Sequence, residues 1–483
     1  MRLDKWRKIG AGKVQKVHFI GIGGSGMCGL AEILNGLDYD VSGSDAKESE
    51  TTKRLSKLGI NCYIGHRAKQ VKDIDLIVKS GAIDMDNPEL KYGVEHSIPI
   101  IQRAEMLAEI MRFGLGIAVA GSHGKTTTTS MMAQVLSAAG EDVTFIVGGL
   151  VKSSNSNSKL GGGNYVVAEA DESDASFLFI HPYIAVVTNI DREHMYKYGN
   201  MQELKKTFLQ FLHHVPFDGL VVICVDDPIL CELEADINRP LVRYGFGKNA
   251  EYRAKKVIQK GLNTSFTAVF PDKKELEVTI GVPGKHNVLN ALACIATADA
   301  IGMESSKIAK GINNFVGVSR RQDLLGSFNG RIGEDDEPLD NIMLIDDYGH
   351  HPTEIECTLK AIKEGWPGRR CIMIFQPHRY SRTQDLFDDF VRVLSMPDEI
   401  LLLDIYAAGE KPIKGISSKT LVKKIAAKGK KDPIYVKDHD GLLKALPKVL
   451  KSNDILITQG AGNIGALSND LANNNLYMKD NIL

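Results

Sequence analysis

Along most of the chain, short apolar runs of β-prone residues alternate with longer stretches that favour helices. Examples are Val17–Ile20, Leu115–Ala120, Cys371–Phe375 and Asp454–Thr458, each followed by a glycine-rich or polar cluster. Strands that alternate with helices form parallel sheets, which bind ligands at the carboxyl ends of their strands. The pattern therefore predicts an α/β fold of mainly parallel, doubly wound sheets with functional residues just beyond the strands.

The chain of 483 residues is long enough for several domains, and we expect three. We place them at residues 1–112, 113–321 and 322–483, each built on its own sheet. In the second segment, Lys152–Asn164 is polar and glycine-rich and predicts a loop, whereas Glu251–Ile280 predicts a small antiparallel excursion. Further strands are expected at Tyr39–Val41, Asp75–Lys79, Tyr165–Ala168, Tyr183–Thr188, Leu220–Val225, Asn341–Ile345 and Ile400–Ile405.

A glycine-rich turn between the strand Leu115–Ala120 and a helix-prone stretch predicts a phosphate site. It reads Gly-Ser-His-Gly-Lys-Thr-Thr-Thr-Thr from 121 to 129. Backbone N–H groups and the positive end of the helix would face an anion, Lys125 could reach the terminal phosphates, and the Thr126 hydroxyl could hold Mg²⁺. Val119 stands five positions before Gly124, so the match is to a shorter P-loop. Kinases, ATPases and ligases all use such loops.

A second glycine-rich turn, Gly-Ile-Gly-Gly-Ser-Gly at 21–26, follows the strand Val17–Ile20 and precedes a helical stretch. Asp45 lies about 20 positions further on, as in dinucleotide-binding Rossmann-like domains. The glycines would let a diphosphate approach the backbone, and Asp45 could accept a hydrogen bond from a ribose hydroxyl. NAD and a UDP-sugar share these groups, so the spacing leaves both ligands open.

Composition narrows the class of protein. With 59 basic and 60 acidic residues, the chain is not expected to bind nucleic acid or an anionic membrane as its main partner. No window is apolar enough to span a bilayer, and Met1–Gly10 is polar and basic without an apolar signal core. Seven cysteines are scattered without a C-x-x-C pair, which favours a reduced, zinc-free, cytoplasmic protein.

Polar residues beyond the strands suggest where chemistry would occur. Mg²⁺ prefers oxygen ligands, and Thr126 and Glu169 lie at the ends of two candidate neighbouring strands. His194 follows the next strand and could help hold a second ion. The pair Arg379 and Arg382 could clamp a carboxylate, because guanidinium offers a planar fork of two donors.

Taken together, the motifs resemble the Mur ligase family over nearly the whole chain. They are GIGGSGM at 21–27, SGSD at 42–45, GSHGKTTTT at 121–129, EADESD at 169–174, GKHNVLNALA at 284–293, GVSRR at 317–321, DDYGHHPTE at 346–354, FQPHRYSRT at 375–383, DIYAAGE at 404–410 and GAGNIG at 460–465. The departures are mild, such as Asn463 where aspartate is frequent and Ser122 where threonine is common.

The resemblance implies a UDP-substrate-binding domain, a central ATPase domain and a mobile C-terminal domain that binds an amino acid. It implies ATP and Mg²⁺ as cofactors and an activity that joins L-alanine to the lactyl carboxylate of UDP-N-acetylmuramate through an acyl phosphate. This reaction belongs to peptidoglycan precursor synthesis, and hence to cell-wall growth, cell shape and division. The protein would be a cytoplasmic monomer or homodimer.

The resemblance also assigns residues, and it makes GIGGSGM a cradle for the UDP diphosphate rather than for NAD. Catalytic roles are expected for Lys125, Glu169, His194 and His350, and metal ligation for Thr126, Glu169 and His194. ATP contacts are expected from Gly121, Ser122, His123, Gly124, Lys125, Thr126, Thr127, His286, Asn287, Arg320 and Asp347. UDP-substrate contacts are expected from Gly21, Gly23, Gly24, Ser25, Gly26, Met27, Asp45, His66, Ser80, Ser173 and Asp174. Amino-acid contacts are expected from Tyr348, His350, Arg379 and Arg382.

Three alternatives remain at this stage. A ligase that adds a recovered tripeptide to the same nucleotide would use identical chemistry with a different acceptor pocket. An NAD-dependent oxidoreductase would account for GIGGSGM but not for the phosphate loop or the C-terminal motifs. A non-catalytic nucleotide sensor would bind ATP without releasing phosphate.

Overall fold

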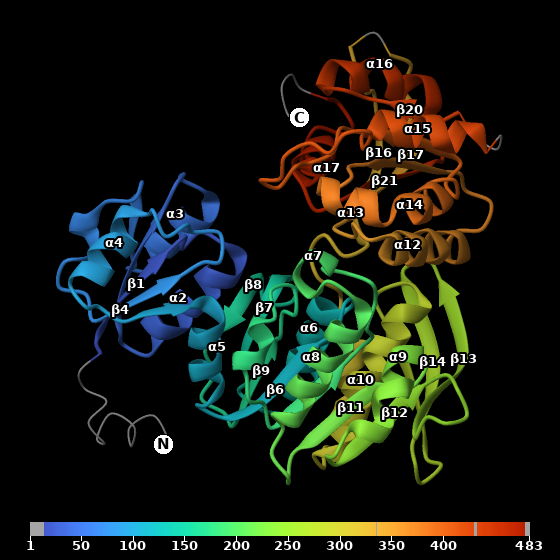
Figure 1. The fold of residues 1–483 in the computed structure, drawn as a ribbon. Helices are drawn as coiled ribbons and strands as arrows, with labels where there is room; N and C mark the ends of the chain where they lie inside the picture. The colour runs from blue at the N-terminus through green and yellow to red at the C-terminus, as the bar shows by residue number, and fades with distance from the viewer. Residues whose placement is uncertain (1–13, 335, 429–431, 479–483) are drawn as a thin grey trace. The chain divides into compact units, whose positions relative to one another are not determined.

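The computed structural model describes residues 14–334, 336–428 and 432–478 (Figure 1). Met1–Gly10, which carries the expectation about a signal segment, lies outside this part. The chain forms two compact units, which are described separately. The first comprises residues up to 254 with 268–276 and 289–314, and the second comprises 255–267, 277–288 and 315–483.

The N-terminal sheet has five parallel strands in the order β3-β2-β1-β4-β5. The order reverses between β1 and β4, and such a switch point opens a crevice at the carboxyl ends of the strands. The cluster Ser42–Asp45, expected after a strand, forms the last part of β2 instead. The elements are β1 (Lys16–Ile20), α2 (Ser25–Gly36), β2 (Asp40–Asp45), α3 (Glu50–Lys57), β3 (Asn61–Ile64), η1 (Ala68–Val71), β4 (Leu76–Lys79), α4 (Pro88–Glu95), β5 (Ile100–Gln102) and α5 (Arg103–Met111).

The central sheet has ten strands in the order β15-β14-β13-β12-β11-β10-β6-β9-β7-β8. The run from β7 through β9, β6, β10, β11 and β12 to β13 is parallel, and β8 pairs antiparallel with β7. Its strands are β6 (Leu115–Ala120), β7 (Thr144–Val151), β8 (Ser156–Lys159), β9 (Tyr165–Glu169), β10 (Ile184–Val187), β11 (Leu220–Cys224), β12 (Leu241–Gly245), β13 (Tyr252–Lys260), β14 (Asn263–Val269) and β15 (Glu275–Ile280). Its helices are α6 (Lys125–Ala138), η2 (Ser176–Phe179), α7 (Met195–Tyr198), α8 (Met201–His213), α9 (Pro228–Leu233), η3 (Glu234–Asp236), α10 (Lys285–Ala300) and α11 (Ser305–Asn313).

The expectation of a loop over Lys152–Asn164 is wrong in part, because the segment contains β8. Serine and asparagine have low strand propensity, but tertiary contacts override it here. Asn157 is buried and donates from Nδ2 to the carbonyl of Ser25 at 2.9 Å, and the Ser158 hydroxyl donates to Glu32 Oε2 at 3.1 Å. The strand is therefore fixed by polar contacts with α2.

The third sheet has six strands in the order β16-β17-β21-β18-β19-β20, and only β16 runs antiparallel to its neighbour. Alternate strand residues enter two separate hydrophobic clusters, such as Met343 and Ile345 against Ile342 and Leu344. Both faces are therefore covered, as in a doubly wound sheet. The elements are β16 (Asp323–Gly330), β17 (Leu339–Asp347), α12 (Pro352–Gly365), β18 (Cys371–Phe375), α13 (Tyr380–Asp385), α14 (Phe387–Val393), β19 (Glu399–Leu402), α15 (Ser418–Ala427), β20 (Ile434–Tyr435), α16 (His439–Val449), β21 (Ile455–Gln459) and α17 (Ile464–Asn473).

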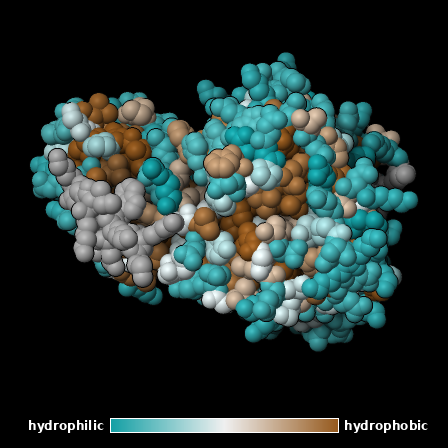
Figure 2. Space-filling view, turned by 90° about the horizontal axis from the view of Figure 1, so that it is seen from below, coloured by the Kyte–Doolittle hydropathy of each residue, from teal (hydrophilic) through white to brown (hydrophobic). Residues whose placement is uncertain are grey.

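The predicted α/β architecture with three mainly parallel sheets is confirmed, whereas the boundaries after residues 112 and 321 stay predictions. Within the described part, no helix combines the length and the apolar character needed to cross a bilayer. On the face shown in Figure 2, hydrophobic areas are bordered by hydrophilic residues.

Candidate active site

The phosphate loop connects β6 to α6 through two glycines with left-handed backbone conformations. The φ angle is 127° at Gly121 and 83° at Gly124. A Cβ at Gly121 would stand 2.2 Å from Thr188 Oγ1, and one at Gly124 would stand 2.7 Å from Asn290 Oδ1. Only glycine fits both the backbone angle and the space, so the sequence dictates the shape of the turn.

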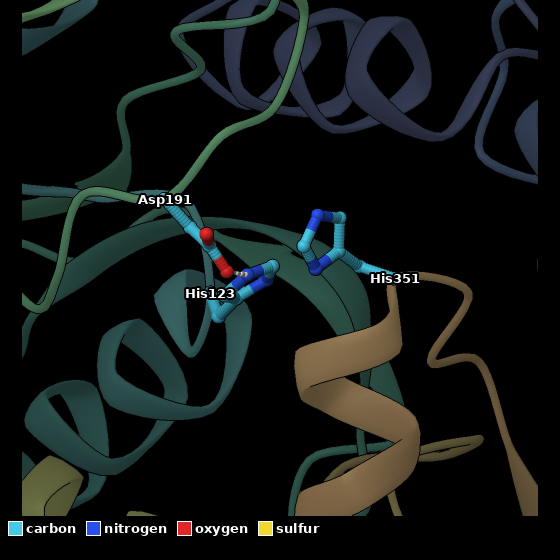
Figure 3. A group of neighbouring side chains, drawn as sticks. All are labelled: His123, Asp191 and His351. Carbon is cyan, nitrogen blue, oxygen red and sulfur yellow. Dashed lines mark hydrogen bonds and ion pairs between the residues drawn. The ribbon is translucent and has the colours of Figure 1, made fainter. Parts of the chain in front are cut away.

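The segment after β10, the neighbour of β6, clamps this loop. Ser122 N donates to the carbonyl of Asn189 at 3.0 Å, and His123 N donates to Asn189 Oδ1 at 2.9 Å. Asp191 N donates back to Ser122 Oγ at 2.8 Å, and Asp191 Oδ2 lies 2.9 Å from His123 Nε2 (Figure 3). His351, drawn in the same figure, is the N-cap residue of α12. These hydrogen bonds therefore fix the position of the loop against the segment after β10.

Lys125, the first residue of α6, folds back over the loop. Its Nζ donates to the carbonyls of Gly121 at 2.7 Å and Ser122 at 3.2 Å, and it lies 2.8 Å from Glu172 Oε2. Burial opposes its charge, but the carboxylates of Glu172, Asp171 and Glu169 hold the pKa of Lys125 above its ordinary value. The ammonium is therefore permanently charged where phosphates would bind.

Glu172 stands in the motif EADESD without an assigned role, yet it is the direct partner of Lys125. Its side chain is 1% exposed, and burial raises its pKa to about 8. The positive charge of Lys125 lowers this pKa, whereas the negative charge of Asp171 raises it further. His194 Nε2 lies 3.9 Å from Glu172 Oε1 and 3.8 Å from Glu193 Oε1. These three side chains are close enough together to hold a metal ion. The structure thus groups His194 with Glu172 and Glu193.

Thr126 and Glu169 meet as the sequence suggested. The Thr126 hydroxyl lies 3.0 Å from Glu169 Oε2, which also accepts a hydrogen bond from Gly148 N at 2.9 Å. Adjacent oxygen ligands of an octahedral Mg²⁺, at bonds of about 2.1 Å, stand about 3.0 Å apart. The donor type and spacing of these two side chains therefore fit Mg²⁺.

The glycine loop after β1 lies at the switch point of the N-terminal sheet. Gly21 has a φ angle of 82°, and a Cβ on it would stand 3.1 Å from the Cβ of Ser80, which follows β4. Gly23 N donates to Asp45 Oδ2 at 2.9 Å. Gly24 caps α2, and Ser25 begins that helix. The side chain of Met27 is buried, and its amide donates to the carbonyl of Gly24 at 2.9 Å.

His66 belongs to a buried polar network that the sequence gave no reason to expect. Its Nδ1 lies 2.9 Å from Ser44 Oγ and 3.2 Å from Glu89 Oε2. Glu89 is fully buried, and its Oε1 lies 3.6 Å from Nε2 of His18, which is also fully buried. Burial alone would raise the pKa of Glu89, but its hydrogen bonds with His18 and Ser44 hold it below the ordinary value. The network fixes the imidazole of His66.

Two other residues assigned to the UDP substrate have local roles after β9. Asp174 Oδ1 accepts a hydrogen bond from Ser176 N at 2.9 Å. Ser173 N donates to Asp171 Oδ1 at 3.0 Å. These bonds shape the turn that carries Glu172.

The residues expected to bind the amino acid converge around His378, which the sequence left unassigned. The ring centroid of His350 is 5.5 Å from those of both Tyr348 and His378. Arg382 Nη1 donates to the carbonyl of His378 and lies 3.1 Å from its Nδ1. Burial, with the charges of His350 and Arg382, lowers the pKa of His378 to about 3, so its ring is neutral. Arg379 Nη1 donates to Glu410 Oε1 at 3.2 Å.

The remaining residues expected to contact ATP belong to the second compact unit. Arg320 Nε donates to Asp346 Oδ2 at 3.0 Å, and its Nη2 donates to the carbonyl of Gly460 at 2.8 Å. Asp347, buried at the end of β17, accepts hydrogen bonds from Gln322 N and Gly349 N, both at 2.7 Å.

His286 and Asn287 open α10 in the same unit. Asn287 is buried and donates from Nδ2 to the carbonyl of Pro283 at 2.7 Å. His286 stands against Gly284, where a Cβ would be 2.6 Å from His286 Cε1. The two residues are therefore fixed by the turn that precedes the helix. Thr127, by contrast, lies in α6 of the first unit and is buried.

Comparison with known proteins assigns the family. The Mur ligase family catalytic domain matches residues 16–114, the Mur ligase middle domain 119–298, and the Mur ligase glutamate ligase domain 331–462. The UDP-N-acetylmuramate–alanine ligase of Thermotoga maritima is 31% identical, over 95% of this chain and 98% of its own, with a TM-score of 0.78. The chain belongs to the Mur ligase family.

Two further solved Mur ligases are similar to the chain. A murein peptide ligase of Psychrobacter arcticus is 24% identical, over 97% of this chain and all of its own, with a TM-score of 0.70. The UDP-N-acetylmuramate:L-alanyl-γ-D-glutamyl-meso-diaminopimelate ligase of Neisseria meningitides is 27% identical, over 64% of this chain and all of its own, with a TM-score of 0.58. As a Mur ligase the chain is an ATP-dependent ligase of peptidoglycan synthesis, and nothing supports the oxidoreductase alternative.

Proposed function

We propose that this Mur ligase joins L-alanine to the lactyl carboxylate of UDP-N-acetylmuramate at the expense of ATP. The observation that carries the proposal is the 31% identity with the T. maritima UDP-N-acetylmuramate–alanine ligase over nearly the whole of both chains. The motifs DDYGHHP and PHRYSRT around the proposed acceptor pocket also resemble the alanine enzyme. The protein would act in the cytoplasm, as a monomer or homodimer.

The first step activates a poor electrophile. The lactyl carboxylate attacks the γ-phosphorus of ATP, giving an acyl phosphate and ADP. Mg²⁺ held by Thr126 and Glu169, with His194 near a second ion, would neutralise phosphate charge. Lys125 stabilises the negative charge that spreads over the transferred phosphoryl oxygens. Its ammonium lies over the loop, with Nζ 2.7 Å from the carbonyl of Gly121.

The ion-pair partner of Lys125 matters for this step. Glu172 Oε2 lies 2.8 Å from Nζ, and phosphate oxygens would compete for the same donors. Because burial raises the pKa of Glu172 to about 8, this carboxyl can take up a proton when the ammonium turns to the phosphates. The exchange avoids an uncompensated buried charge.

The second step forms the amide. The neutral amine of L-alanine attacks the acyl carbon, and phosphate leaves. Arg382, held by His378, would bind the alanine carboxylate and orient the amine, with Arg379 and Tyr348 beside it. His350, 5.5 Å from His378 between ring centroids, is the candidate base for the ammonium proton.

One assay tests the proposal: phosphate release with Mg-ATP and UDP-N-acetylmuramate, with L-alanine, D-glutamate or the tripeptide as acceptor. We expect release with L-alanine, and transfer of ¹⁸O from the labelled lactyl carboxylate into inorganic phosphate. Release with the tripeptide alone would instead establish the recycling ligase, to which the similarity with two solved murein peptide ligases points. ATP binding without release for any acceptor would establish the sensor.

A further inference from the structure

Arg103 lies against the glycine loop, although no motif singled it out. It is the first residue of α5, whose start is fixed because Gln102 N donates to Glu105 Oε2 at 2.7 Å. A Cβ on Gly26 would stand 2.9 Å from Arg103 Cδ and 3.2 Å from Arg103 Nη1. The glycine at 26 therefore makes room for a guanidinium at the first turn of α2.

This arrangement places the positive guanidinium of Arg103 beside the positive end of α2. The first turn of α2 carries unsatisfied N–H groups and the positive end of the helix dipole, and the guanidinium adds a full positive charge. Among the described residues, the structure gives Arg103 one ion pair, from Nη2 to Asp171 Oδ2 at 3.7 Å, which exceeds hydrogen-bond length. Its side chain is 25% exposed, so donors remain available for a ligand.

We propose that Arg103 binds the diphosphate of the UDP substrate, opposite the backbone N–H groups of the glycine loop. Guanidinium presents a planar fork that matches two phosphate oxygens, and an anion between Arg103 and α2 removes the repulsion between them. Arg103 is thus a specificity-determining residue for a nucleoside diphosphate. The inference rests on the proposed function, because it adds a contact to the same substrate site.

The test measures binding of UDP, UMP and uridine by calorimetry to the full-length wild type and to Arg103→Ala and Arg103→Lys. Arg103→Ala should weaken UDP binding by about 10- to 100-fold, the range for a hydrogen bond to a charged group. The UDP affinity of Arg103→Lys should lie between those of the wild type and Arg103→Ala, because lysine keeps the charge and loses the planar fork of two donors. The affinity for uridine, which has no phosphate, should be the same in all three proteins.

Arg112→Ala is the matched control, because Arg112 caps the other end of α5 and its side chain is 64% exposed. It should bind UDP like the wild type. Equal UDP affinity in wild type and Arg103→Ala overturns the inference, as does an equal loss for UDP and uridine, which would mean that Arg103 only shapes the loop. A wild type that binds no UDP at all contradicts the proposed function itself. An unchanged midpoint of urea unfolding in Arg103→Ala verifies that this variant is folded.

Discussion

Removal of Lys125 should expose the cost of an uncompensated buried carboxylate. Glu172 is 1% exposed and Lys125 is 13% exposed, so little solvent screens the pair. Removal of one partner of a buried pair typically costs about 3–5 kcal/mol of unfolding free energy. Glu172 can lower this cost by taking up a proton, because burial already raises its pKa to about 8. The stability of Lys125→Met should therefore depend on pH.

The direction of this pH dependence follows from the protonated and ionised forms of Glu172. Its pKa is higher in the folded protein than in the unfolded chain, so the stability that its protonation supplies is complete below about pH 4.5 and is lost as pH rises through about 8. Each pH unit in this window contributes at most about 1.4 kcal/mol, so the unfolding free energy of Lys125→Met should be about 2–3 kcal/mol lower at pH 8 than at pH 6.

Urea unfolding at pH 6 and pH 8 measures the effect. The double variant Lys125→Met/Glu172→Gln keeps the shape of the site without either charge, and its stability should exceed that of Lys125→Met at pH 8. Both variants should lose turnover by at least about 100-fold, because the phosphoryl group loses its cation. A Lys125→Met protein with the same stability at both pH values, or no more stable after Glu172→Gln, would refute the reasoning.

Three further predictions concern the other parts of the site. Glu169→Gln should lower turnover at least about 100-fold and raise the Mg²⁺ concentration needed for half-maximal rate; near-normal rates at low Mg²⁺ would exclude its role as a metal ligand. Arg382→Lys should raise the KM for L-alanine by about tenfold or more and that for ATP much less, and an equal rise in both would count against the carboxylate clamp. Gly121→Ala places a Cβ 2.2 Å from Thr188 Oγ1 at a φ angle of 127°, so ATP binding measured by calorimetry should be lost while UDP binding persists. Retained ATP affinity would show that the loop can relax.

The strands that position the site could be predicted where an apolar run is bounded by glycine or charge. Leu115–Ala120 and Cys371–Phe375 are observed with the expected limits. The helix-prone stretch after the phosphate loop forms α6, and this helix already includes threonines of low helix propensity, because it begins at Lys125 directly after the glycine turn. β8 could not be predicted, since its serines and asparagine are ordered by contacts with α2.

Two carboxylates that the sequence missed have partners that lie far away along the chain. Glu172 is 47 positions from Lys125, and Glu89 is 23 positions from His66. Neither carboxylate stands out locally, because acidic residues near strand and helix ends are common. His378 stood inside a motif, but only its contacts with His350 and Arg382 reveal what it holds. Motifs therefore indicate where the candidate site lies, and packing identifies further side chains that contact its residues.

In the first compact unit, charged side chains connect the two proposed nucleotide sites. Asp171 interacts with a basic residue beside each of these loops: burial opposes its charge, but Lys125 and Arg103 hold its pKa below the ordinary value. Its Oδ2 is 3.7 Å from Arg103, at the glycine loop, and its neighbour Glu172 binds Lys125, at the phosphate loop. If a diphosphate binds the guanidinium of Arg103, it offsets positive charge that faces Asp171, and Lys125 remains the counter-charge of that carboxylate, so the net positive charge near the phosphate loop should fall. Such a loop disfavours additional anions and favours Mg²⁺-bound ATP over the free nucleotide. The order in which the substrates bind should therefore depend on whether the nucleotide carries its metal ion.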